Sequence, residues 1–232
     1  MRAATRVLGP LVGVALALGG MAPAGAGQPF RDDFSGHRPS DVWDEGSTHG
    51  VWDVRFNGYG SVRVVCVGAR GSLALQLRPA PAGAPDETHA TLVTTREQYR
   101  DGVLTLEART TRQLRENGAP NPWEVAWVVF RYVDDEHFYY LALKTNGWEL
   151  GKRDPAYPGG QRFLDTGMYP TFQAGVWAMV RIAMAGPAIT VDVDGSRLST
   201  TVDTERPILS GRLGMYTEDA EVQFDNVSFV GA

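Results

Sequence analysis

The chain has a single cysteine, Cys66, so no disulfide can form within it. Only four histidines are present, and none lies in a metal-binding spacing such as HxH or HExxH, which disfavours a zinc enzyme. Glycine-rich phosphate-binding motifs are also missing, which argues against a nucleotide-dependent enzyme. Cys66 itself lies in the apolar run SVRVVCV, and we expect it to be a small buried core residue rather than a reactive thiol.

Basic residues are in the minority, with 22 lysines and arginines against 27 acidic residues and a formal net charge of −5. Nucleic acids and anionic membranes attract basic surfaces, and the chain has no basic cluster to offset this balance. The composition therefore predicts neither nucleic acid nor a membrane as a partner.

The N-terminal residues 1–26 have the pattern of a secretory signal peptide. Two arginines are followed by an apolar run over residues 7–22, and small residues at 24–26 supply a cleavage site. The apolar run is too short for a membrane anchor. We therefore expect a secreted protein whose mature part, residues 27–232, forms one domain and is a monomer.

Amphipathic helical periodicity is nearly absent from the mature chain. Short stretches of alternating apolar and polar residues recur instead, separated by Gly, Pro, Asn and Asp. So many short strands predict an all-β fold, a two-sheet antiparallel jelly-roll sandwich. The expected strands are 51–56, 61–67, 72–78, 90–95, 102–111, 123–132, 137–145, 148–152, 161–166, 176–183, 188–194, 196–202, 211–216 and 221–230.

Alternation along four of these strands predicts which side chains point away from the core. A one-residue slip in register would invert each assignment. If the four strands are neighbours, one exposed face carries Glu107, Arg109, Trp127, Arg131, Tyr140, Lys144 and Glu149.

Such a face is typical of a glycan-binding groove, because aromatic rings pack against sugar rings while charged groups bind hydroxyls or acidic groups. The alternative is a solvated face whose charges pair across strands. The predicted substrate-binding residues are Arg109, Trp123, Trp127, Arg131, Lys144 and Lys152.

Two kinds of chemistry fit this groove. Glycoside hydrolysis needs two carboxyl groups, and Glu107, Glu124 and Glu149 are the candidates. A polysaccharide lyase would instead need cations that neutralise an acidic sugar and a group that moves a proton, for which Tyr140 is the candidate. The sequence leaves both reactions open.

Several segments resemble the concanavalin A-like lectin and glucanase superfamily. These are FRDDFSG at residues 30–36, WVVFRYVDDEHFYYLAL at 127–143, and the C-terminal stretch GRLGMYTEDAEVQFDNVSFV at 211–230. The similarity is strongest to the laminin-G-like and 3-keto-disaccharide-hydrolase-like branches of secreted bacterial proteins. The resemblance implies a carbohydrate-active protein, a non-catalytic glycan-binding module or a laminin-G-type protein-interaction domain as alternatives. The ExDxxE signature of laminarinase-type glycosidases and the RxELR and QIH signatures of alginate lyases are absent.

The same resemblance implies a structural calcium ion where the N-terminal segment meets the last strand. The matching positions are Asp33 and Asp225. Carboxylates and backbone carbonyls from two crossing segments are suitable calcium ligands. Calcium is therefore the one cofactor that the sequence predicts.

Overall fold

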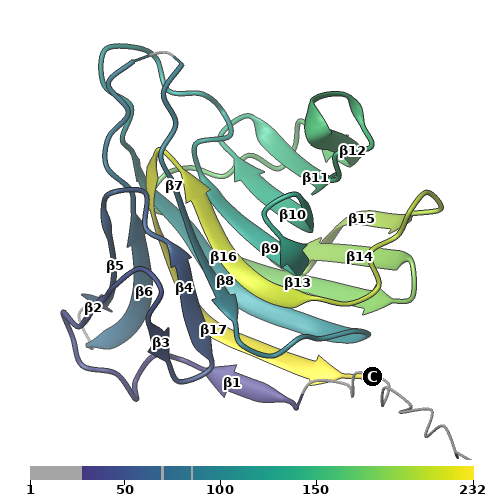
Figure 1. Cartoon of the computed structure of the whole chain (residues 1–232), viewed down its shortest axis with the longest axis horizontal. Coiled ribbons are helices and arrows are strands. Elements are labelled where there is room, and N and C mark those ends of the chain that lie inside the picture. Colours follow the sequence, from purple (N-terminus) through teal and green to yellow (C-terminus); the bar gives the residue numbers. More distant parts are fainter. Residues whose placement is uncertain (1–27, 69–70, 85) are drawn as a thin grey trace, which may run out of the picture.

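The computed structural model describes residues 28–68, 71–84 and 86–232, and it is built almost wholly from strands. Two antiparallel sheets pack face to face as a sandwich (Figure 1). The predicted all-β jelly-roll fold is therefore confirmed. The predicted signal peptide lies outside the described residues. No helix in the described part of the chain is long and apolar enough to cross a membrane.

In the first sheet, sheet A, the first strand of the described residues lies beside the last strand. β1 (Phe30–Asp32) pairs with β17 (Ala220–Gly231), which also pairs with β6 (Ser72–Arg78) and β8 (Gly102–Gln113). The order of the other strands is β15 (Ser196–Val202), β14 (Ala188–Val193), β13 (Ala178–Ala185), β8 (Gly102–Gln113), β17 (Ala220–Gly231), β6 (Ser72–Arg78), β5 (Ser61–Val67) and β2 (Val42–Trp43).

The second sheet, sheet B, bears the candidate site on its outer face. A short 3₁₀ helix, Pro158–Gly160, precedes its edge strand β12. Its order is β12 (Gln161–Gly167), β11 (Gly147–Arg153), β10 (His137–Lys144), β9 (Ala126–Asp134), β16 (Arg212–Glu218), β7 (Ala90–Thr95), β4 (Trp52–Phe56) and β3 (Thr48–His49).

Each of the predicted strands is present, because the alternation of apolar and polar residues reports directly on the two faces of a strand. The dipeptide Asp194-Gly195 is typical of a two-residue hairpin, and such a hairpin joins β14 and β15, with both residues at positive φ. The strands β1, β2 and β3 were not predicted, because they are only two or three residues long.

The core lies between the sheets and is built from the inward residues of both. Leu104 and Leu106 of sheet A and Leu141 and Leu150 of sheet B belong to this one buried cluster. Cys66 is exposed rather than buried, so that prediction is wrong. The edge strand β2 pairs with β5 only at Val62 and Arg63. Cys66 lies near the other end of β5, which β2 does not reach.

Candidate functional site

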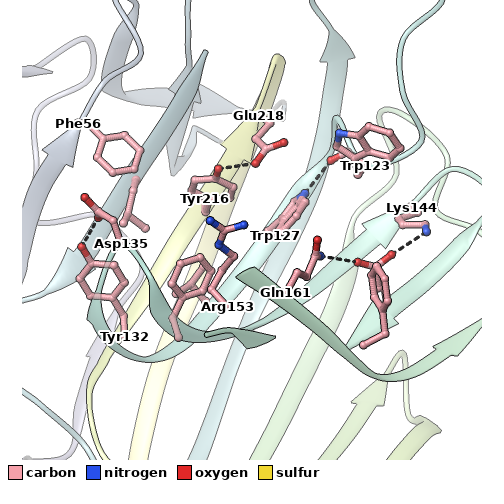
Figure 2. Close-up of a pocket in the computed structure, with 15 residues that line it drawn as sticks. Phe56, Trp123, Trp127, Tyr132, Asp135, Lys144, Arg153, Gln161, Tyr216 and Glu218 are labelled. Carbon is pink, nitrogen blue, oxygen red and sulfur yellow. Dashed lines mark hydrogen bonds and ion pairs between the residues drawn. The ribbon is translucent and has the colours of Figure 1, made fainter. Parts of the chain in front are cut away.

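A pocket of about 580 Å³ opens on the outer face of sheet B (Figure 2). Its lining comes from seven strands of the sheet, from β12 to β4, from the segment before β9, and from the turn between β9 and β10. The lining residues are Phe56, Leu92, Trp123, Trp127, Val129, Tyr132, Asp135, Phe138, Lys144, Glu149, Arg153, Gln161, Phe163, Tyr216 and Glu218.

The floor of the pocket is a second apolar cluster, separate from the core between the sheets. Trp127, Val129 and Tyr140 belong to it, whereas Val128 between them points into the core. The Trp127 ring lies 4.6 Å from the Tyr140 ring and 5.3 Å from the Tyr216 ring. Trp127 and Tyr140 therefore take the outward direction that alternation predicts, but as packed floor residues rather than exposed rings.

One end of the pocket is polar and centres on the Glu149 carboxylate. Its Oε1 accepts a 2.8 Å hydrogen bond from Tyr140 Oη, and its Oε2 lies 3.0 Å from Lys144 Nζ. Gln161 Nε2 also donates to Tyr140 Oη. Gly151 is required here, because a Cβ at this position would collide with the Tyr140 hydroxyl. Burial raises the pKa of Tyr140, so its hydroxyl remains protonated.

The middle of the pocket brings together Tyr216, Glu218 and Arg153. Tyr216 Oη donates to Glu218 Oε1 at 2.6 Å. Burial raises the pKa of Glu218, and the carboxylates of Asp219 and Glu124 raise it further. Arg153 lowers the pKa of Glu218 and of Tyr216, and Figure 2 shows its side chain directed towards Tyr216. Within the described residues its side chain donates only to Gly159 O, at 3.3 Å, and no carboxylate lies within 4.0 Å.

The other end of the pocket is mostly apolar, and Tyr132 and Asp135 close it. Tyr132 Oη donates to Asp135 Oδ1 at 2.5 Å. Burial raises the pKa of Tyr132 to about 12, with this carboxylate adding to the shift. The Tyr132 hydroxyl is therefore a hydrogen-bond donor at every physiological pH.

Regular alternation along residues 126–132 predicts that Tyr132 faces the core with Val128 and Phe130, but a bulge in β9 makes that prediction wrong. The pairing of β9 with β16 shifts between Val129 and Tyr132, and Arg131 adopts a φ of +50°. One extra residue reverses the alternation, so Tyr132 lines the pocket instead. Arg131 is fully buried and not in the predicted groove. It donates to Gly186 O at 2.7 Å and to Ile208 O at 2.9 Å, which ties sheet B to two loops.

Glu107 and Arg109 do not share a surface with the pocket, because β8 belongs to sheet A and not to sheet B. Their outward direction is as predicted, but they face away on the other side of the sandwich. Arg109 lies 4.5 Å over the Trp177 ring and donates to Gln223. Alternation fixes the face of a strand but not the sheet that the strand joins.

Glu124 is also away from the pocket, although it was one of the three candidate carboxyl groups for the groove. Its strand begins only at Ala126, and the preceding residues form a turn that directs Glu124 inward. Glu124 Oε1 accepts from Arg115 at 2.6 Å and from Asn121 at 2.7 Å, and the side chain is fully buried. Trp123, by contrast, lines the pocket and is 44% exposed.

Lys152 is fully buried on the inner side of β11 and cannot contact a ligand in the pocket. Its Nζ lies 2.7 Å from Asp203 Oδ2 and donates to Glu205 O. The reason is its parity, since Lys152 points to the same side of the strand as the core residue Leu150. Arg153, the next residue, has the outward parity of Glu149 and was missed because the expected strand ended one residue early.

The predicted calcium positions lie where β1 and β17 meet, as expected. Burial raises the pKa of Asp225 to about 6, and the carboxylates of Glu107 and Asp33 raise it further. Asp33 Oδ1 accepts from the Ser35 backbone and hydroxyl. In the described part of the chain no three or more His, Cys, Asp or Glu side chains form a group that could hold a metal ion. The side chains present thus supply too few ligands on their own, and calcium stays a prediction.

Glu218, Tyr216 and Gln161 are further pocket residues that the sequence argument did not select. Leu213 and Met215 point into the core, so Tyr216 and Glu218, at positions of the opposite parity on the same strand, point outward. That signal was present in GRLGMYTED. Their proximity to Arg153 could not be inferred, because it depends on the order of strands in sheet B.

Comparison with known families gives a match over most of the chain. A family model described as a 3-keto-alpha-glucoside-1,2-lyase-like domain matches residues 32–230. No curated protein matches the sequence.

Among solved structures, the chain is similar to the carbohydrate-binding module CBM66 from Bacillus subtilis, with a TM-score of 0.56 and 13% identity over 76% of this chain and 93% of that chain. A GH16 protein of Bacteroides ovatus gives a TM-score of 0.55 and 10% identity over 87% and 99%. A β-glucanase of Bacillus licheniformis gives a TM-score of 0.53 and 13% identity over 89% and 99%. At these identities the similarity establishes a shared fold.

Proposed function

The chain belongs to the family of 3-keto-alpha-glucoside-1,2-lyase-like domains, and on this premise we propose that its sheet B pocket eliminates the C1 substituent of a 3-keto-glucoside. It is a carbohydrate-active jelly-roll domain. The observation that carries the proposal is that Glu218 and Arg153 both line one open pocket, on β16 and β11, and that within the described residues Arg153 has no carboxylate partner.

The reaction needs a base at C2 and a positive group at the C3 oxygen. A ketone at C3 acidifies the C2 hydrogen, so a base can remove that proton and form an enolate. The electron pair then forms the C1–C2 double bond while the C1–O bond breaks. The departing oxygen takes a proton from water, and the base returns its proton to water, so no oxidation or reduction occurs.

Glu218 is the base in this proposal. A general base works best when its pKa is near the working pH, and burial raises the pKa of Glu218 in that direction. The Tyr216 hydroxyl, bonded to Glu218 Oε1 at 2.6 Å, fixes the carboxylate in one orientation. The second oxygen of Glu218 is then available for the C2 proton.

Arg153 stabilises the enolate in this proposal. Its guanidinium has no carboxylate partner in the described part of the chain, so its donors can bind the C3 oxygen. Positive charge placed where negative charge develops contributes most in a site that excludes water.

The polar end of the pocket is assigned to the hydroxyls of the sugar ring. Lys144, Glu149 and Gln161 form one hydrogen-bonded group there. Both Glu149 oxygens already accept hydrogen bonds from protein donors, so we assign Glu149 and Tyr140 to binding rather than to proton transfer.

The size of the pocket favours a small glycoside over a polymer. A volume of about 580 Å³ is typical of sites for small molecules. Together with the predicted signal peptide, this suggests a secreted protein that acts on small extracellular glycosides.

The test is to incubate residues 27–232 with 3-keto methyl α-glucoside and follow absorbance in the near ultraviolet. Elimination gives a conjugated enone that absorbs there, whereas hydrolysis gives a saturated keto sugar that does not. We expect absorbance and release of methanol, both lost in Glu218→Gln. Binding of the keto sugar without either product would refute the proposal and favour a non-catalytic glycan-binding module.

A further inference from the structure

The two ends of the sheet B pocket differ in polarity. Figure 2 shows Lys144 and Gln161 at one end and Phe56 and Tyr132 at the other. The polar end comes from β10, β11 and β12, and its carboxylate and amine are the paired Glu149 and Lys144. The other end is lined by the apolar cluster of Phe56, Leu92, Val129, Tyr132 and Phe138, with the Asp135 carboxylate beside Tyr132.

The proposed reacting groups lie between these ends. Glu218 is on β16 and Arg153 is on β11, and β9 and β10 separate the two strands in sheet B. In the proposed orientation the sugar places C2 at Glu218 and the C3 oxygen at Arg153, and its remaining hydroxyls lie at the polar end. The C1 substituent then extends away from the polar end, towards β7 and β4. The leaving group then contacts Phe56, Leu92 and Val129.

A second sugar fits that end poorly. The polar groups lining it are Tyr132 Oη and the Asp135 carboxylate, and because Tyr132 Oη donates to Asp135 Oδ1 at 2.5 Å, Asp135 Oδ2 is the main acceptor left there for a second sugar. Each sugar hydroxyl left without a partner there would cost about 1–3 kcal/mol. An apolar group of the same size would instead gain from removing its surface from water.

We propose that this pocket takes glucosides whose C1 substituent is a flat apolar group such as phenyl, bound by the apolar end around Phe56, Leu92 and Val129. The inference rests on the proposed function for the direction of the sugar. It assigns the polar end to the glucose unit and the apolar end to the leaving group.

Binding of unoxidised glucosides tests the preference without requiring any reaction. Calorimetry would compare phenyl α-glucoside, methyl α-glucoside and maltose on residues 27–232. We expect phenyl α-glucoside to bind about 10- to 50-fold more tightly than the other two, from burial of one ring at about 25 cal/mol per Å².

Two variants and one control locate the preference. Phe56→Ser and the near-isosteric Val129→Thr should weaken the binding of phenyl α-glucoside several-fold and leave the binding of methyl α-glucoside unchanged. Phe163→Ala, on β12 beside the polar end, should leave the ratio of the two affinities unchanged. Circular dichroism would verify that each variant is folded.

Equal affinity for phenyl α-glucoside and maltose would overturn the inference, as would a preference that survives in both Phe56→Ser and Val129→Thr. The proposed reaction fails separately. A phenyl preference in a protein that eliminates no 3-keto-glucoside would support the apolar subsite and refute the lyase. Elimination with equal KM for the methyl and phenyl substrates would support the lyase and refute the apolar subsite.

Discussion

Replacing Arg153 by methionine is expected to abolish most of the elimination activity while leaving the fold intact. The guanidinium points into the pocket near Tyr216 and Glu218, and its one hydrogen bond to the described protein is the 3.3 Å contact with Gly159 O. Methionine keeps the length and the apolar stem of the side chain but removes the charge.

The magnitude follows from the two roles of the side chain. Removing a positioned donor to a developing oxyanion typically lowers kcat about 10²- to 10³-fold. The effect on stability should be below about 1 kcal/mol, because a partly exposed side chain with one long hydrogen bond contributes little to folding. Loss of activity and loss of stability are therefore separable at this residue.

The assay is kcat and KM for 3-keto methyl α-glucoside, with the melting temperature measured on the same samples. Arg162→Met is the matched control, because Arg162 lies on the adjacent strand β12, forms an ion pair with Glu205 and does not line the pocket. We expect the control to retain activity. Arg153→Met with kcat within about threefold of the parent, far less than the effect of removing an oxyanion donor, would refute the role of Arg153.

The remaining predictions concern Glu218, Arg131 and calcium. Activity should rise with pH as Glu218 loses its proton, with a midpoint above its ordinary value of 4.5; a profile flat through the acidic range would contradict this. Since the folded state holds that proton more tightly than the unfolded chain, Glu218→Gln should raise the melting temperature at neutral pH, with a gain that disappears as pH falls below 4.5. Arg131→Met should cost about 3 kcal/mol in urea unfolding, because it leaves two loop carbonyls without their donor, and a loss under about 1 kcal/mol would be inconsistent with its buried contacts. Calcium should raise the melting temperature of the parent but not of Asp225→Asn, and an equal response in both would exclude Asp225 as a ligand.

The fold was predictable because alternation acts on each strand separately. The sequence resemblance to the 3-keto-disaccharide-hydrolase-like branch is confirmed by the family match over residues 32–230. Tyr140, Lys144 and Glu149 take the predicted direction because β10 and β11 are regular over those residues. Predictions of this kind depend only on local periodicity.

The site was less predictable for two physical reasons. Local sequence does not show which sheet a strand joins. The sequence therefore placed Glu107 and Arg109 on one face with residues of β9, β10 and β11, although β8 belongs to the other sheet of the sandwich. Irregular backbone also reverses local periodicity, as the bulge at Arg131 and the turn before Ala126 both do. The polar groups that the pocket gathers from β11 and β16 are brought together only by the strand order of sheet B.

The most direct test of the account follows the hydrogen at C2 of the sugar. A 3-keto methyl α-glucoside with deuterium at C2 would be incubated with the protein in water enriched in ¹⁸O, and the products analysed by mass spectrometry. We predict loss of the C2 deuterium to solvent and no ¹⁸O at C1 of the initial product. A product that keeps deuterium at C2 and gains ¹⁸O at C1 would show hydrolysis instead, and would contradict the roles assigned to Glu218 and Arg153.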